Sequence, residues 1–232
     1  MRFRSIYLLL TLLALIFLPL QTAAAAPAAD VGNDKATLDF PNTVTFSASL
    51  QSGAVITSVM LEYGTEQQTC GQVIAKAYPQ FTPAASLDVE WTWDMRQSGS
   101  LPPGAAIWWR WHFTDQAGKE TVSEKKTVTW LDDVHPWQTI SAGDLRLHWY
   151  GFETSFAQDM LDAGVGGLEF NATQSGLKTE APIDLYVYAN YDDMREAILY
   201  KPSWTGGMAF SEHNIVIMGA SSGADTNWDK TT

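Results

Sequence analysis

The chain has 232 residues but only one cysteine, Cys70. A single cysteine excludes a disulfide within the chain, so the packing of apolar side chains must hold the fold together. We interpret Cys70 as a small buried apolar residue rather than a reactive thiol.

Basic residues are also scarce. The chain has 14 Lys and Arg and 26 Asp and Glu, which gives a formal net charge of −12. Such a chain is repelled by nucleic acid and by anionic membranes. The acidic residues are scattered, which is typical of a solvated surface. Aromatic residues make up 12% of the chain and include ten Trp, which favours packed β structure or a sugar-facing surface over disorder.

Long apolar runs are missing except near the N-terminus, where one run of 15 residues extends from Ile6 to Leu20. It is shorter than the roughly 20 residues that a transmembrane helix needs. Two arginines precede it and small residues follow it, which predicts a secretory signal peptide over residues 1–25, cleaved after Ala25. We therefore expect an exported protein, extracellular or at the cell surface, with no membrane contact from this segment after the signal is removed.

The next part of the chain has the pattern of an all-β domain. Residues 26–35 are small and polar and predict a flexible lead-in. Over residues 36–133 apolar and polar residues alternate, which predicts strands near 43–50, 56–63, 86–93, 106–114 and 121–130. Turns separate them and no helical period is present, so we predict an antiparallel β-sandwich. It resembles immunoglobulin-like and fibronectin-like modules, and a resemblance of fold implies no activity.

One strand of this sandwich is rich in tryptophan and allows two interpretations. Trp109, Trp111 and Phe113 share one face, while Trp108, Arg110 and His112 share the other. The aromatic side chains could stack on sugars, or they could form core on one face while Arg110 lies over Trp108 on the other. We favour the second interpretation, because nothing places polar groups around a cluster of exposed rings.

From residue 137 to residue 232 the pattern changes to α+β. It predicts a strand at 144–150, a helix with apolar residues from 152 to 168, and a strand at 182–188. A short helix at 193–200 should follow, capped by Asn190 or Asp192. A terminal hairpin at 207–210 and 214–219 then turns at the polar residues 211–213.

Three stretches in this part carry a resemblance: DLRLHWYGFETSFAQDMLDAGVGGLEF, IDLYVYANYDDMREAI and GGMAFSEHNIVIMG. In content and order they resemble the N-terminal half of a thermolysin-like zinc metallopeptidase domain, a peptidase MA-like fold of the gluzincin type. The resemblance implies that an edge strand lines the cleft and pairs with an extended peptide substrate. The implied substrate-binding residues are Gly207, Met208, Ala209 and Phe210, although the same residues also fit an ordinary edge strand with a glycine bend.

The zinc motif of that family, H-E-x-x-H, is absent from the sequence. The four histidines are His112, His135, His148 and His213, and no two of them are four residues apart. We therefore assign no catalytic residue, no metal ligand and no cofactor within this chain. We expect the zincin-like domain to be incomplete, with zinc and a peptide or protein substrate belonging to the full-length protein. The alternative hypothesis is a complete exported binding or adhesion protein with a Trp-rich sandwich.

Overall fold

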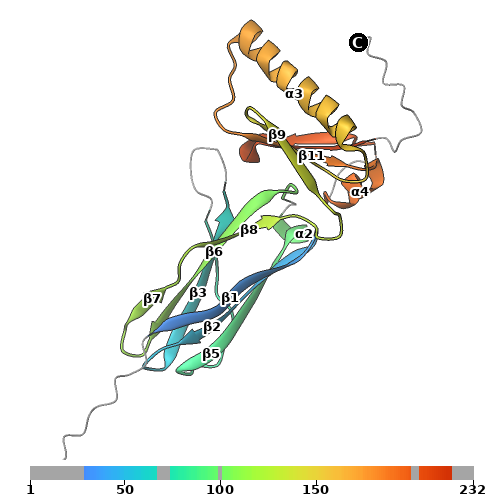
Figure 1. Cartoon of the computed structure of the whole chain (residues 1–232). Coiled ribbons are helices and arrows are strands. Elements are labelled where there is room, and N and C mark those ends of the chain that lie inside the picture. Colours follow the sequence, from blue (N-terminus) through green and yellow to red (C-terminus); the bar gives the residue numbers. More distant parts are fainter. Residues whose placement is uncertain (1–28, 67–73, 99–100, 200–203, 221–232) are drawn as a thin grey trace, which may run out of the picture.

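The computed structural model describes residues 29–66, 74–98, 101–199 and 204–220. Two parts follow one another along the chain, a β-sheet part and an α+β part (Figure 1). The predicted signal peptide and Cys70 lie outside the described residues.

The first part consists of two antiparallel sheets. One sheet has the order β1-β2-β5, with strands Asp30–Asp39, Thr43–Gln51 and Ser86–Asp94. The other has the order β4-β3-β6-β7, with strands Ala75–Ala77, Ile56–Thr65, Ala105–Asp115 and Glu120–Val122. Strand β8 (Lys126–Trp130) also pairs with β6, and a short helix α2 (Met95–Ser98) follows β5.

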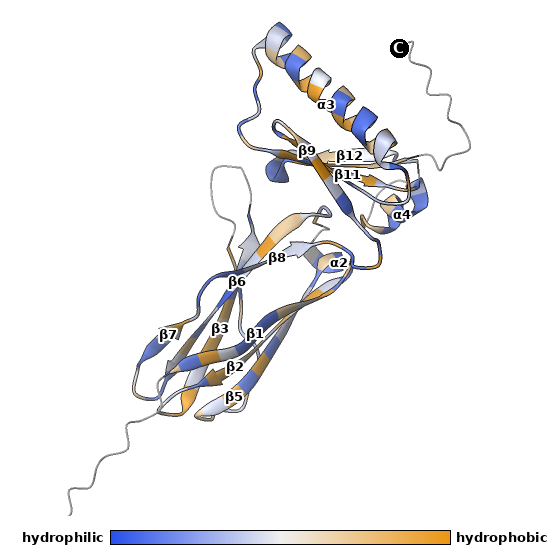
Figure 2. Cartoon of the chain, in the orientation of Figure 1, coloured by the Kyte–Doolittle hydropathy of each residue, from blue (hydrophilic) through white to orange (hydrophobic). Residues whose placement is uncertain are grey.

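The core of this part lies between the two sheets, as the alternating pattern predicts. Every second residue of β2 is buried, with Val44, Phe46 and Leu50 all fully buried. The inward residues of β3 and β6 meet them, and the Phe46 ring lies 5.5 Å from the Trp109 ring. Figure 2 shows the resulting alternation of apolar and polar residues along the strands.

Two boundaries differ from the sequence prediction. Strand β1 begins at Asp30, so residues 30–35 are sheet and not a flexible lead-in. The predicted last strand at 121–130 is interrupted between β7 and β8. The Ser123 hydroxyl accepts a hydrogen bond from the Trp111 backbone N–H at 2.9 Å, so a side chain replaces the strand partner at this point.

The second part is a five-stranded sheet in the order β12-β13-β11-β10-β9. The strands are β9 (Gln138–Ala142), β10 (Leu145–Trp149), β11 (Ile183–Tyr188), β12 (Gly207–Phe210) and β13 (Ile215–Gly219). The three inner strands are parallel, and both outer strands are antiparallel to their neighbours. Strand β9 was not predicted, because only two of its five residues are apolar, which is too few to establish an alternating pattern.

Two helices lie on opposite faces of this sheet. Helix α3 (Thr154–Ser175) packs over β9 and β10, burying Ala157 and Leu161 in the same apolar cluster as Leu147. Gly164 allows this close approach, since a Cβ there would lie 2.5 Å from the Leu145 side chain. Helix α4 (Tyr191–Glu196) packs against β13 and β11 from the other face. Asn190 caps it, which is one of the two caps predicted, and the helix begins and ends earlier than the predicted range 193–200.

The face of the second sheet that carries α4 also meets the sandwich (Figure 1). Buried residues of both parts belong to one contiguous apolar cluster, which includes Trp130 and Tyr186. Gly104, with a φ of +87°, comes so close to the Tyr186 ring that a Cβ would lie 2.3 Å from it. In the described part of the chain, no helix has the length and apolar character needed to span a membrane.

Candidate functional site

Strand β12 forms one edge of the second sheet, and it holds all four residues for which substrate binding was predicted. The short 3-10 turn η1 (Ser211–His213) joins it to β13. Within the described residues only β13 pairs with β12, so the other side of the strand is open.

The register of the hairpin determines which backbone groups face this open side. The Gly219 N–H donates to the Gly206 carbonyl at 3.1 Å. Antiparallel strands alternate between hydrogen-bonded and non-hydrogen-bonded pairs, so Met208 and Phe210 also bond to β13. The N–H and C=O groups of Gly207 and Ala209 therefore point away from the sheet, where another strand could pair with them.

The side chains of β12 divide in the same way. Met208 and Phe210 are half-buried against the core, whereas Gly207 and Ala209 are exposed. Met208 and Phe210 thus hold the strand in place, and Gly207 and Ala209 offer the free backbone groups. The sequence could not make this distinction, since it depends on which pairs of the hairpin are hydrogen-bonded.

Gly207 has a structural reason of its own to be glycine. A Cβ there would lie 2.9 Å from the Ile217 carbonyl oxygen, closer than side chains approach a carbonyl. The glycine therefore permits tight pairing with β13, irrespective of any substrate.

One exposed side chain just before β12, that of Trp204, was not singled out from the sequence. Trp204 is 81% exposed, although only two residues separate it from the edge strand β12 in the sequence. The backbone that follows it is anchored, because Thr205 is buried and its carbonyl accepts a hydrogen bond from Arg195 Nε at 3.3 Å. The Tyr191 ring packs against Gly219, and the Arg195 guanidinium lies 5.6 Å from the centre of that ring.

A polar cluster occupies the sheet face opposite α3. Asp184 accepts one hydrogen bond from Arg146 Nη2 at 2.5 Å and bonds to His148 Nε2 at 2.8 Å. The other ring nitrogen of His148 lies 2.9 Å from the Thr139 hydroxyl, and the imidazole stacks on Tyr186. Burial raises the pKa of Asp184, but the bonds to His148 and Arg146 outweigh it and lower the pKa overall. The cluster fixes strands β9, β10 and β11 to one another.

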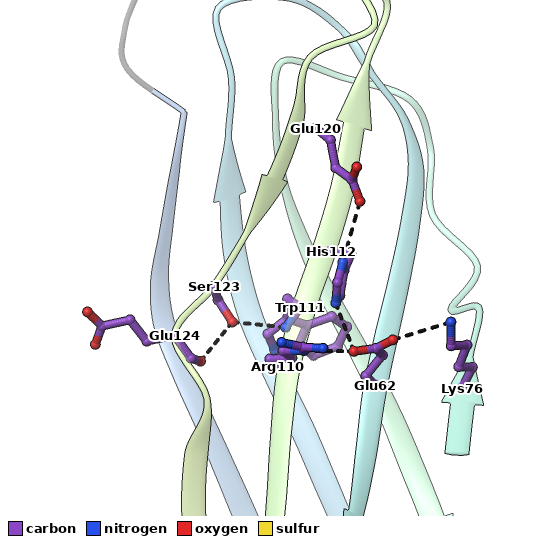
Figure 3. A network of polar contacts seen from close by, with 8 residues as sticks. All are labelled: Glu62, Lys76, Arg110, Trp111, His112, Glu120, Ser123 and Glu124. Atoms are coloured by element: carbon purple, nitrogen blue, oxygen red, sulfur yellow. Dashed lines mark hydrogen bonds and ion pairs between the residues drawn. The ribbon is translucent and has the colours of Figure 1, made fainter. Parts of the chain in front are cut away.

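A second polar network lies on the outer face of the sandwich (Figure 3). Glu62 is buried and contacts Arg110 at 2.7 Å, His112 at 3.0 Å and Lys76 at 3.3 Å. Burial raises the pKa of Glu62, but the three hydrogen bonds outweigh it and lower the pKa to about 2. Glu120 contacts the other nitrogen of the His112 ring at 3.5 Å.

The Trp-rich strand β6 lies in the core, which agrees with the favoured interpretation. Trp109 and Trp111 are buried, and both indole N–H groups donate to the Asp34 carboxylate, at 2.7 and 3.1 Å. Trp108 is also buried, but Lys125 lies over its ring at 5.0 Å where Arg110 was expected. Arg110 turns to Glu62 instead, because the buried carboxylate is the stronger partner.

The four histidines lie far from the arrangement that a zinc ion needs. His112 and His148 belong to the two polar networks, and His135 stacks on Tyr150 at 4.0 Å. His213 ends the turn after β12 and bonds to the Glu66 backbone of the sandwich. Across residues 29–66, 74–98, 101–199 and 204–220, no group of three or more His, Cys, Asp or Glu side chains could hold a metal ion.

Comparison with known families identifies the region that contains this edge. Residues 165–232 match the sequence model of the Peptidase MA superfamily, so this region, which includes β11, α4 and the β12–β13 hairpin, is peptidase MA-like. No curated protein matches the chain.

Solved structures show only weak likeness. OgpA from Akkermansia muciniphila is 12% identical with a TM-score of 0.34, over 46% of this chain and 28% of that one. The BhCBM56 structure is 11% identical with a TM-score of 0.28, over 44% of this chain and 88% of that one. The sporulation control protein Spo0M from Bacillus subtilis is 13% identical with a TM-score of 0.27, over 46% and 50%. Likeness at this level carries no inference about function.

Proposed function

We propose that residues 137–232 form the substrate-binding wall of a zinc-dependent metallopeptidase of the gluzincin type. In the full-length protein, a zinc-activated water would hydrolyse a peptide bond. An extended peptide would pair with Gly207, Met208, Ala209 and Phe210 by adding a strand to the sheet. The observation that carries this proposal is the open antiparallel edge strand inside the region that matches the Peptidase MA superfamily.

The residues that the structure describes do not fit a zinc ion. The sequence contains no H-E-x-x-H, and its four histidines lie apart from one another. Under the proposal, the ligands therefore belong to residues of the full-length protein outside the printed sequence, and the chain alone is inactive.

The exposed part of the second sheet supports the proposal that other residues of the full-length protein complete the site. Helix α3 packs over β9 and β10, and α4 packs on the other face. Helix α3 reaches Val187 of β11, which is fully buried in the same apolar cluster, but on this face Leu185, Val216 and Met218 of β11 and β13 are only half-buried. An apolar strip of this kind gains stability when a helix covers it, and a helix there would lie beside β12.

The N-terminal half completes the proposal. Residues 1–25 have the pattern of a signal peptide, so we propose that the protein is exported. The sandwich would be an immunoglobulin-like module that precedes the peptidase domain and contacts its sheet through Gly104 and Tyr186.

The full-length protein tests the proposal directly. We expect an H-E-x-x-H helix within a few tens of residues after Thr232, bound zinc in the purified protein, and peptide hydrolysis that a chelator abolishes. A full-length sequence without this motif would overturn the proposal. Hydrolysis that persists without the metal would also overturn it.

A further inference from the structure

We propose that Trp204 determines substrate specificity at the β12 edge by holding an aromatic side chain of the paired peptide. The inference rests on the proposed peptide-binding function. It adds to that function a substrate class: peptides whose aromatic residue lies near the beginning of β12 when they are bound. It starts from the exposure of Trp204, which at 81% is the highest among the large apolar side chains of the described residues.

An indole this exposed is unusual where the backbone that follows it is held in place. Thr205 is 5% exposed, and its carbonyl accepts the hydrogen bond from Arg195. A Cβ on Gly206 would lie 3.5 Å from the Tyr191 ring, so the backbone that follows Trp204 lies on that ring. The anchored backbone reduces the ordering cost when a ligand covers the indole.

The position of the loop identifies the occupant as a peptide. Trp204 precedes by three residues the first β12 residue with free backbone groups, Gly207. A strand pairs with an edge through its backbone, and neighbouring pockets or rings then select its side chains. A peptide that bonds to Gly207 and Ala209 would carry a side chain past Trp204.

The chemistry at this point favours an aromatic side chain. Trp204 and Tyr191 are both exposed, and aromatic rings pack on one another by offset or edge-to-face contact. The nearby cation, Arg195, already bonds to Asp192 at 3.1 Å and lies over the Tyr191 ring. It is therefore engaged, and an acidic side chain of the peptide would gain little there.

The test measures binding of short extended peptides to the chain in its exported form. One set carries a single Phe that is moved along the peptide, and a matched set carries Ala instead. We expect one Phe position to bind at least about tenfold more tightly than its Ala counterpart. Trp204→Ala should remove this preference, and Trp204→Phe should restore most of it.

Two further variants separate this proposal from the proposed function. Phe170→Ala removes another exposed aromatic ring, 65% exposed on α3, and should leave the Phe preference unchanged. Ala209→Pro removes an outward N–H and should weaken every peptide alike, which tests the edge itself. If Ala209→Pro weakens binding but Trp204→Ala does not change the Phe preference, the specificity role is wrong and the edge function stands.

Other occupants would overturn the specificity role as well. A preference for glycosylated over Phe-containing peptides would show that the indole serves a sugar. Dimers in analytical ultracentrifugation that Trp204→Ala dissociates would show that a second copy of the chain covers the indole. If no peptide binds to the wild-type chain or to any variant, the proposed function fails together with the inference.

Discussion

Replacing Glu62 by Gln tests whether the network of Figure 3 stabilises the sandwich. The side chain is 7% exposed, and its carboxylate contacts two permanent cations and one imidazole. The substitution keeps the shape of the side chain but removes its charge. The chain should therefore fold and lose only the electrostatic part of the interaction.

The size of the loss follows from the exposure of the partners. A fall in the pKa of Glu62 from 4.5 to about 2 sets an upper bound of about 3 kcal/mol. The side chains of Arg110 and Lys76 are 39% and 51% exposed, so water solvates them once the carboxylate is gone. We therefore expect Glu62→Gln to lower the free energy of unfolding by about 1–2 kcal/mol at pH 7.

The pH dependence gives a sharper signature. The folded-state pKa of Glu62 is depressed, so its contribution is complete above about pH 4.5 and is lost as pH falls towards 2. Urea unfolding followed by circular dichroism at several pH values would measure it. The difference between wild type and Glu62→Gln should shrink over this window.

Glu66 provides the matched control. It forms an ion pair with Lys125 at 3.2 Å, but its side chain is 53% exposed. Glu66→Gln should change the unfolding free energy by less than about 0.5 kcal/mol. Equal effects of the two substitutions, or a Glu62→Gln difference that stays constant down to pH 3, would refute the reasoning.

Three further predictions concern the core, the junction and acid stability. Asp34→Ala should destabilise the chain by about 2–3 kcal/mol in urea unfolding, because two buried indole N–H groups lose their acceptor; a cost below 1 kcal/mol would contradict this. Gly104→Ala forces a Cβ into the Tyr186 ring, so limited proteolysis should cut the second part sooner than in wild type. Burial lowers the pKa of His213 from 6.5, so stability should fall below about pH 6.5, and His213→Gln should remove this slope.

The sandwich could be predicted from the sequence because alternation survives tertiary packing. Val44, Phe46 and Leu50 are apolar at every second position and are buried together. The break after β7 could not be predicted, since it depends on the Ser123 hydroxyl meeting a backbone N–H of another strand. The position of Lys125 over the Trp108 ring could not be predicted either, because the two residues are distant in sequence and meet only in the folded chain.

The candidate edge was predicted in its place but not in its detail. The two short apolar runs and the polar turn between them indicated a hairpin, and the structure has that hairpin at the edge of a sheet. Which residues face outward depends on the pairing with β13, which a single sequence does not reveal. Trp204 was missed because the sequence carries no direct signal for the exposure of a tryptophan.

Amide hydrogen exchange of β12, followed by NMR with and without an extended peptide, tests the central claim most directly. The free chain should protect the amides of Met208 and Phe210, which bond to β13, and leave those of Gly207 and Ala209 in fast exchange. A bound peptide should slow exchange at Gly207 and Ala209 and leave the other two amides unchanged. Binding that leaves Gly207 and Ala209 in fast exchange would contradict the account, because the peptide would then lie elsewhere.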